Sequence, residues 1–132
     1  MPFTHTVEIN YRGLGTSAVL SSYPVSAGLE SNINESIPDA AADQQVDWAV
    51  DISQIKSFVL RANGGALSIK TNSTSVPQET IALADGKPVH WDENAHHTIG
   101  SIFAGDITKL YVSNSSGNAV TLEILCLVDP TV

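Results

Sequence analysis

The chain has 132 residues, of which 42% are hydrophobic and only 15% charged, and its 14 acidic against 6 basic side chains give a net charge of −8. This length fits one domain with its own core, so residues 1–132 are interpreted as a single domain. Because the chain is acidic and has no basic run, no nucleic-acid partner is predicted. No membrane partner is predicted either, since the sequence has no secretory signal and no run of ~20 consecutive apolar residues.

The N-terminal part of the chain shows the alternation that is typical of β-strands. From His5 to Tyr11 the odd-numbered residues form the less polar face, which predicts a strand over residues 4–12 behind an N-terminal arm of residues 1–5. Residues 46–52 repeat the pattern, with Trp48 on the apolar face. Both segments therefore predict strands with one buried face.

Residues 24–45 lie between these two strands and have no sustained period. The segment is rich in Ser, Asn, Asp and Ala. A stretch of this length without structure is unusual inside a compact domain. We expect a long irregular surface loop that either orders against a partner or is flexible.

Two β-rich runs flank Asn63-Gly64 within residues 56–72. Asn-Gly is a strong signal for a two-residue hairpin turn. A turn at these residues pairs Leu60 with Leu67 and keeps the apolar side chains on one face. The pattern predicts a β-hairpin.

A second hairpin is predicted near the C-terminus. Residues 114–118 join the strand of residues 107–113 to the strand of residues 119–128, which brings Val112 opposite Val120. The pairing again keeps apolar side chains together.

The second half of this last strand is apolar on both faces. Residues 125–128 are Leu, Cys, Leu and Val, so the core covers one face only. The outer face, with Leu125 and Leu127, needs a long loop or a neighbouring subunit to cover it. The pattern indicates oligomerisation.

Shorter strands are predicted at residues 17–20, 80–84, 89–91 and near 100–103, with Pro88 marking a sheet edge. The total is about eight or nine short strands without a convincing amphipathic helix. The sequence predicts an all-β fold, a two-sheet antiparallel β-sandwich, with jelly-roll as the preferred topology.

Three of the four histidines cluster in residues 90–97. The set His90, Glu93, His96 and His97 has ligand types that suit zinc, iron or manganese. Its order differs from the His-x-His and Glu spacing of cupins, so a solvated loop is the favoured interpretation. No metal and no cofactor are predicted.

The sequence also offers no clear nucleophile. Cys126 lies in an apolar run, which is typical of a core thiol, and no Gly-x-Ser-x-Gly occurs. No catalytic residue is predicted. Trp48 is expected in the core, whereas Trp91 with Tyr111 offers an alternative aromatic platform for a sugar.

Several segments resemble small virion-structure proteins of tailed bacteriophages and their prophages. They are IKSFVL at 55–60, LSIKTNST at 67–74, TIAL at 80–83, PVHW at 88–91, FAGDITKLYVSN at 103–114 and LEIL at 122–125. The resemblance implies a β-sandwich that serves as a head decoration, or cement, protein, commonly a trimer, or as a tail, connector or fibre protein. It transfers no catalytic residue.

We therefore expect a non-enzymatic virion protein, assembled in the host bacterial cytoplasm, that binds the major capsid protein or another virion protein. A homo-oligomer is expected, with a trimer favoured. The alternative is a carbohydrate- or receptor-binding module of a phage tail or fibre. The interface residues expected from the arm, the loop and the last strand are Phe3, His5, Leu29, Ile33, Ile37, Leu125 and Leu127.

Overall fold

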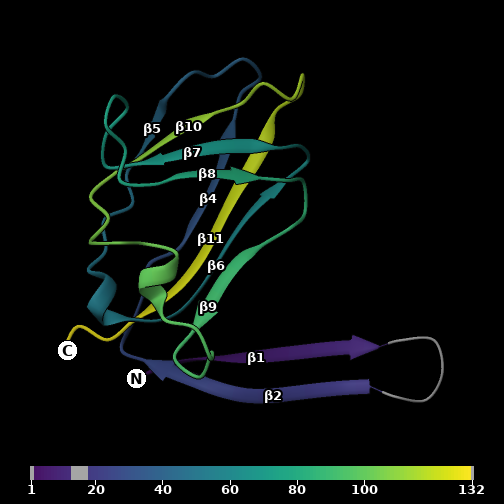
Figure 1. Cartoon of the computed structure of the whole chain (residues 1–132), viewed down its shortest axis with the longest axis vertical. Coiled ribbons are helices and arrows are strands. Elements are labelled where there is room, and N and C mark those ends of the chain that lie inside the picture. The colour runs from purple at the N-terminus through teal and green to yellow at the C-terminus, as the bar shows by residue number, and fades with distance from the viewer. Residues whose placement is uncertain (1, 13–17, 132) are drawn as a thin grey trace.

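The computed structural model describes residues 2–12 and 18–131, and its regular elements are strands and two short 3-10 turns (Figure 1). The expected all-β class with antiparallel sheets is confirmed. The strands are β1 Phe3–Arg12, β2 Ala18–Ala27, β3 Leu29–Glu30, β4 Ile33–Ile37, β5 Gln44–Val46, β6 Ile55–Asn63, β7 Leu67–Thr71, β8 Thr80–Leu83, β9 Val89–Asp92, β10 Leu110–Ser113 and β11 Val120–Val128. The turns are Ile52–Gln54 and Ile99–Ser101.

The strands form two larger sheets and one small one. The β10 sheet has the order β5-β10-β7-β8. The β11 sheet has the order β4-β11-β6-β9, with β3 beside β4 on the same edge of β11. Strands β1 and β2 form a hairpin of their own, which Figure 1 shows running out from one end of the body.

Buried side chains from both larger sheets belong to one hydrophobic core. The β10 sheet contributes Ile69 and Leu110, and the β11 sheet contributes Leu60 and Leu122. The rings of Phe58 and Trp48 both pack against Phe103, with centroid separations of 5.3 Å and 6.2 Å. The predicted apolar face of residues 46–52 is confirmed by burial at residues 46, 48 and 50, although the strand itself ends at residue 46.

Both predicted hairpins are wrong, because the two strands of each pair belong to different sheets. Strand β6 pairs with β11 and β9, whereas β7 pairs with β10 and β8. Leu60 accordingly lies opposite Ile124 and Leu67 opposite Leu83. Strands β10 and β11 are separated in the same way. The apolar side chains that were expected to be neighbours in one sheet instead share the core between two sheets.

The crossing from β6 to β7 explains the glycines that suggested a hairpin. Gly64 has a φ of 103°, which favours glycine. A Cβ on Gly65 would lie 2.7 Å from Cγ2 of Val120 and 2.9 Å from the Ser116 side chain. The two crossings therefore pack closely against each other, and the glycines permit that approach.

Residues 24–45 do not form a long irregular loop. They contain the end of β2, all of β3 and β4, and the start of β5. These strands were not recognisable from apolar residues because β4 is an edge strand beside β11. Its outward residues, such as Asn34 and Ser36, are polar and exposed. Backbone pairing with β11 and the burial of the inward residues Ile33 and Ile37 hold this edge.

Two other segments differ from the expectation, at the N-terminus and at residues 99–101, whereas the short strand predicted near residues 17–20 is confirmed in its described part. Phe3 and His5 begin β1, so residues 3–5 are paired with β2 rather than forming a free arm, and Met1 lies outside the described residues. Of residues 17–20, residues 18–20 belong to β2 and residue 17 lies outside the described part. Residues 99–101 form a 3-10 turn rather than a strand.

Candidate functional site

The N-terminal hairpin is held against the outer face of the β11 sheet at one end. Val25 and Ala27 of β2 bury Leu127 of β11 in a small cluster separate from the main core. The Tyr23 hydroxyl donates a hydrogen bond of 2.9 Å to Oδ2 of Asp92. The hairpin therefore covers part of the apolar outer face of β11.

A groove of about 660 Å³ lies between β1 and the outer face of the β11 sheet. On the β1 side, the residues that line it are the six consecutive positions 4–9, and none of the described lining residues comes from β2. Successive residues of a strand point to opposite faces. A groove that touches all six therefore runs along the backbone edge of β1 rather than across one of its faces.

The wall opposite β1 is apolar at its centre. Val59 lies directly opposite Leu125 in the register of β6 and β11, and their exposed fractions are 40% and 53%. Pro88 also lines this wall. A smaller hollow of about 230 Å³ shares these three residues. The exposed apolar surface of the groove therefore continues beyond β1.

The smaller hollow is bordered by an ion pair that holds its own charges. Nη2 of Arg61 donates to both carboxylate oxygens of Glu123, at 3.0 Å and 3.1 Å. The pair spans β6 and β11 and is partly exposed. It limits the apolar wall on this side.

The ionisable groups that line the groove favour a negative site. Glu8 and Asp92 are in the lining, together with His5 and His90, and the described lining residues include no Lys or Arg. Asp92 is buried, and its Oδ1 accepts the backbone N–H of Asn94 at 2.8 Å. Burial first, then the hydrogen bond and charge of Asp92, raise the pKa of Tyr23 above its ordinary value. The arrangement keeps the tyrosine hydroxyl protonated and donating.

The residues expected at an interface have different fates in the fold. Phe3 and Leu29 are exposed, and so is Leu125 in the groove wall. Ile37 and Leu127 have exposed fractions of 0% and therefore offer no surface to a partner. Ile37 faces the main core, and Leu127 is covered by the chain's own hairpin rather than by a neighbouring subunit.

The other two expected residues are half-buried. Ile33 packs against the main core. His5 lies with Nε2 3.7 Å from Oε2 of Glu30, which joins β1 to β3. His5 also lines the groove.

Sequence reasoning missed Val59, Pro88 and His90 as groove residues. The alternation of β6 contained a signal for this surface, since the apolar Val59 stands between the polar outward residues Ser57 and Arg61. It was not recognisable without knowing that β6 lies beside β11, because Val59 alone is an ordinary strand residue.

The histidine cluster is not assembled as a metal site. Within residues 2–12 and 18–131, no group of three or more His, Cys, Asp or Glu side chains is placed to hold a metal ion. His96 and His97 are exposed, and Glu93 lies 3.6 Å from Nζ of Lys56. The backbone carbonyl of His97 accepts the Trp91 indole N–H at 2.9 Å.

The aromatic residues considered for sugar binding do not form one platform. Trp48 is buried in the main core, and Trp91 packs partly against that core. Tyr111 belongs to β10, where it lies opposite Lys70 and Gln45, whereas Trp91 belongs to β9 of the other sheet. The two residues therefore lie on different sheets.

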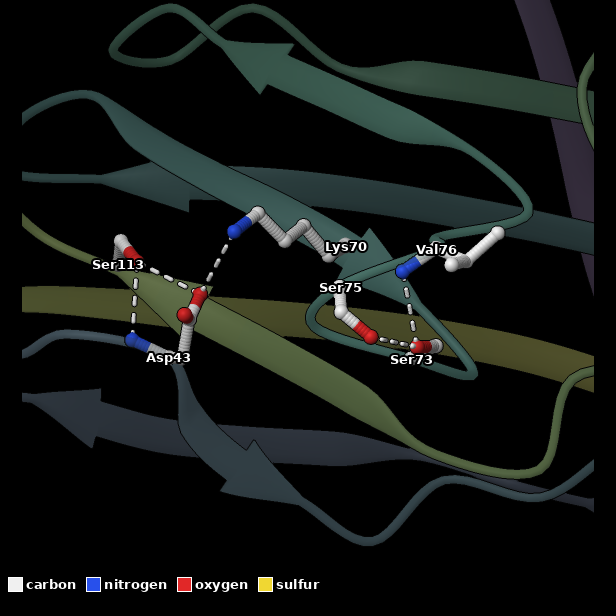
Figure 2. Close-up of polar contacts among 6 residues, drawn as sticks. All are labelled: Asp43, Lys70, Ser73, Ser75, Val76 and Ser113. Carbon is white, nitrogen blue, oxygen red and sulfur yellow. Dashed lines mark hydrogen bonds and ion pairs between the residues drawn. The ribbon is translucent and has the colours of Figure 1, made fainter.

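Figure 2 shows a Ser, Lys and Asp cluster on the β10 sheet that resembles a catalytic set only in composition. Nζ of Lys70 and Oγ of Ser113 both contact Oδ1 of Asp43, each at 3.3 Å. The backbone N–H of Asp43, which has a φ of 49°, donates to the same Oγ at 2.9 Å. A lysine that acts as the general base of a catalytic serine contacts the serine hydroxyl itself. The cluster instead fixes the chain before β5 to β7 and β10.

The neighbouring turn in Figure 2 is also held by its own side chains. Oγ of Ser73 accepts the backbone N–H of Val76 at 3.1 Å and lies 3.5 Å from Oγ of Ser75. Val76 has an exposed fraction of 80%. These contacts shape a surface turn.

No helix in the described chain has the length and apolar composition that a membrane crossing requires. Comparisons with protein-family models, with curated proteins and with solved structures found no match.

Proposed function

We propose that this chain is a non-enzymatic structural protein of a bacteriophage virion, a capsid decoration (cement) protein that binds the major capsid protein on the head. The observation that carries the proposal is the open groove between the edge of β1 and the exposed Val59 and Leu125. A site of this shape suits contact with another protein chain. The sequence resemblance to small virion proteins supports the same role.

We further propose that the two larger sheets form a β-sandwich of jelly-roll topology. The strand orders β4-β11-β6-β9 and β5-β10-β7-β8 support this proposal. From β4 to β11, each connection passes from one sheet to the other except the one between β7 and β8, which pair directly. This alternation is what two interleaved Greek keys require.

The protein is proposed to act as a homo-oligomer, with a trimer favoured, at its place in the virion. Exposed Phe3, Leu29 and Leu125 support contacts between copies or with a capsid, because large apolar residues on a surface are stabilised by burial. Many copies on a symmetric shell turn modest contacts into stable attachment. The chain would strengthen the head by joining neighbouring capsid subunits.

The test uses purified phage heads that lack the protein because its gene has been deleted. The purified chain is added over a range of concentrations, and bound and free chain are separated on a density gradient. Saturable binding with a fixed number of copies per head, together with slower release of DNA on heating, is expected. If the chain remains at the top of the gradient although heads are present, the decoration role is overturned. Binding to isolated tails would move the role to the tail.

A further inference from the structure

The free edge of β1 has a definable hydrogen-bonding pattern. Pro24 of β2 lies directly opposite Thr6 of β1. Proline has no N–H to donate, so this position fits a pair whose N–H groups point away from the partner strand. Thr4 and Ser26, two residues further along, support the assignment, because their hydroxyl oxygens lie only 2.8 Å apart and side chains are closer in such pairs.

The outward groups of β1 therefore belong to Thr4, Thr6 and Glu8. Their backbone N–H and C=O groups point away from β2 and toward the edge along which the groove runs. On the other edge of the hairpin, Pro24 removes a donor from β2. The hairpin thus has one edge that is blocked by proline and one that is open.

The open edge of β1 is longer than the edges of the two larger sheets. The edge strands β3, β4, β5, β8 and β9 have 2, 5, 3, 4 and 4 residues, whereas β1 has 10 residues in continuous register with β2. Edge strands are usually protected by shortness, proline, lysine or a bulge. Strand β1 contains neither proline nor lysine, and in the described part of the chain no other strand pairs with it.

The groove adds a surface for side chains to this backbone edge. An extended segment that paired with β1 would direct alternate side chains toward Val59 and Leu125, which are exposed. Main-chain hydrogen bonds and pockets for alternate side chains are the two elements of strand addition.

The charges around the groove indicate which segment fits. Glu8 and Asp92 line it without a described Lys or Arg, and the whole chain has a charge of −8. An acidic segment is repelled by these carboxylates when it enters the groove. A segment with basic side chains is attracted.

We propose that the open edge of β1 and the facing wall of the β11 sheet form a strand-addition site for an extended segment of a partner protein, apolar at alternate positions and basic between them. The inference rests on the proposed docking function, since it identifies the site and the chemistry of the partner segment.

The first experiment measures binding of a synthetic peptide, nine residues long, acetylated and amidated, in which Val alternates with Lys or Thr. Binding is followed by calorimetry and by amide hydrogen exchange at Thr6 and Glu8. Two N-methylated peptides, one modified at the odd and one at the even positions, serve as a matched pair. Strand addition predicts that one of them binds and the other does not, because only alternate amides face β1. Replacing Lys with Glu is expected to abolish binding.

The second experiment compares two proline variants of the hairpin. Thr6→Pro removes one outward donor from the open edge, and peptide binding is expected to weaken about tenfold. Ser22→Pro lies at the equivalent outward position of β2, opposite Glu8, and is expected to leave binding unchanged. Retained exchange protection at the Val7 amide shows that the hairpin is intact in both.

A third variant tests the wall without changing the backbone. Leu125→Ser removes an exposed apolar side chain and is expected to weaken peptide binding severalfold. Equal binding by Thr6→Pro, Ser22→Pro and the unmodified chain overturns the inference, as does equal binding of both N-methylated peptides. Self-association that Thr6→Pro abolishes, without peptide binding, overturns the basic segment in favour of a second copy.

The phage heads separate this inference from the proposed function. If the unmodified chain and Thr6→Pro bind heads equally well, the strand-addition site is wrong and the decoration role stands. If neither binds heads, the decoration role itself fails.

Discussion

Tyr23 and Asp92 join the N-terminal hairpin to the β11 sheet through a hydrogen bond of 2.9 Å between residues 69 positions apart in the chain. Asp92 is buried, and its other carboxylate oxygen accepts the N–H of Asn94. Beside this bond, the small cluster of Val25, Ala27 and Leu127 holds the hairpin. The position of the hairpin, and with it the width of the groove, therefore depends on few contacts.

Replacing Tyr23 with Phe removes the hydroxyl and keeps the ring. We expect the hairpin to open more often, with its free energy of opening lowered by about 1.5–3 kcal/mol, because one hydrogen bond to a charged carboxylate is lost. The opening is local, so the free energy of unfolding of the two larger sheets changes little. Hydrogen exchange at the amides of β2 measures it, and equal protection in both proteins would contradict the role of this bond.

The same hydroxyl gives the hairpin a dependence on alkaline pH. Burial, followed by the bond to and the charge of Asp92, raises the pKa of Tyr23 above its ordinary value of 10.0. The folded state therefore holds the proton more tightly than the unfolded state. The contribution of the Tyr23–Asp92 bond to holding the hairpin against the β11 sheet is complete below pH 10. It is lost as the pH rises through the raised pKa of Tyr23. The protection factors of the β2 amides should fall over this pH range in the unmodified chain and should stay constant in Tyr23→Phe.

Phe103 is fully buried where the rings of Trp48 and Phe58 meet it. We expect Phe103→Ala to lower the free energy of unfolding by about 3–5 kcal/mol, because it removes a large side chain and leaves a cavity. Val76→Ala is the control, since Val76 is largely exposed and its change should cost less than about 0.5 kcal/mol. Urea titration of both variants measures the difference, and similar midpoints would contradict the assignment of this core.

Local periodicity predicted burial well and pairing badly. Leu60, Leu67, Val112 and Val120 were expected on buried faces, and all four are in the core. The same side chains are buried whether two strands lie side by side or face each other across a core. The apolar pattern therefore could not distinguish a hairpin at Asn63 from a crossing between sheets.

The groove shows a similar limit. Leu125 was recognised because the last strand is apolar on both faces, a property of one segment. Val59 and Pro88 belong to the site only because β6 and β9 extend the sheet beside β11, which depends on strand order. The covering of Leu127 by Val25 depends on where the hairpin folds back, and no local pattern encodes that distance.

Asn114 links the end of β4 to the crossing between β10 and β11. Its buried amide nitrogen donates to the carbonyls of Ile37, Pro38 and Asn118 at 3.0, 3.2 and 2.7 Å. Its oxygen accepts the backbone N–H and the hydroxyl of Ser116 at 3.0 and 2.7 Å. Asn114→Ala should lower the free energy of unfolding by about 2–3 kcal/mol, because these buried groups lose their partner. Thermal unfolding measures it, with the exposed Ser115→Ala as control.

Asn114→Asp tests the direction of these bonds. Once ionised, the new carboxyl has no proton to donate and would face three carbonyl oxygens. Ionisation is then unfavourable in the folded state, so the folded pKa lies above the unfolded one and stability falls as pH rises above about 4. The variant should be closer in stability to the unmodified chain at pH 4 than at pH 8. A loss that does not change with pH would show that the amide nitrogen does not face these carbonyls.

Cys126 should be unreactive while the chain is folded. Its thiol is completely buried, and burial raises the pKa of Cys126 to about 12. Because the thiolate is the reacting form, alkylation at pH 8 requires that the strand open first. Without denaturant, the rate of labelling should therefore follow the opening of β11. When urea is added, the rate should increase in parallel with unfolding.

The adjacent position provides the matched control for this thiol. Leu125 lies on the opposite face of β11 and is exposed, so Leu125→Cys in a Cys126→Ala background places a thiol one residue away at the surface. That thiol should react at the rate of an exposed cysteine, and addition of the basic Val-Lys peptide should slow it if the segment occupies the groove wall. Rapid labelling of Cys126 in the unmodified chain would show that β11 opens readily. Such opening would be incompatible with a rigid outer face for docking.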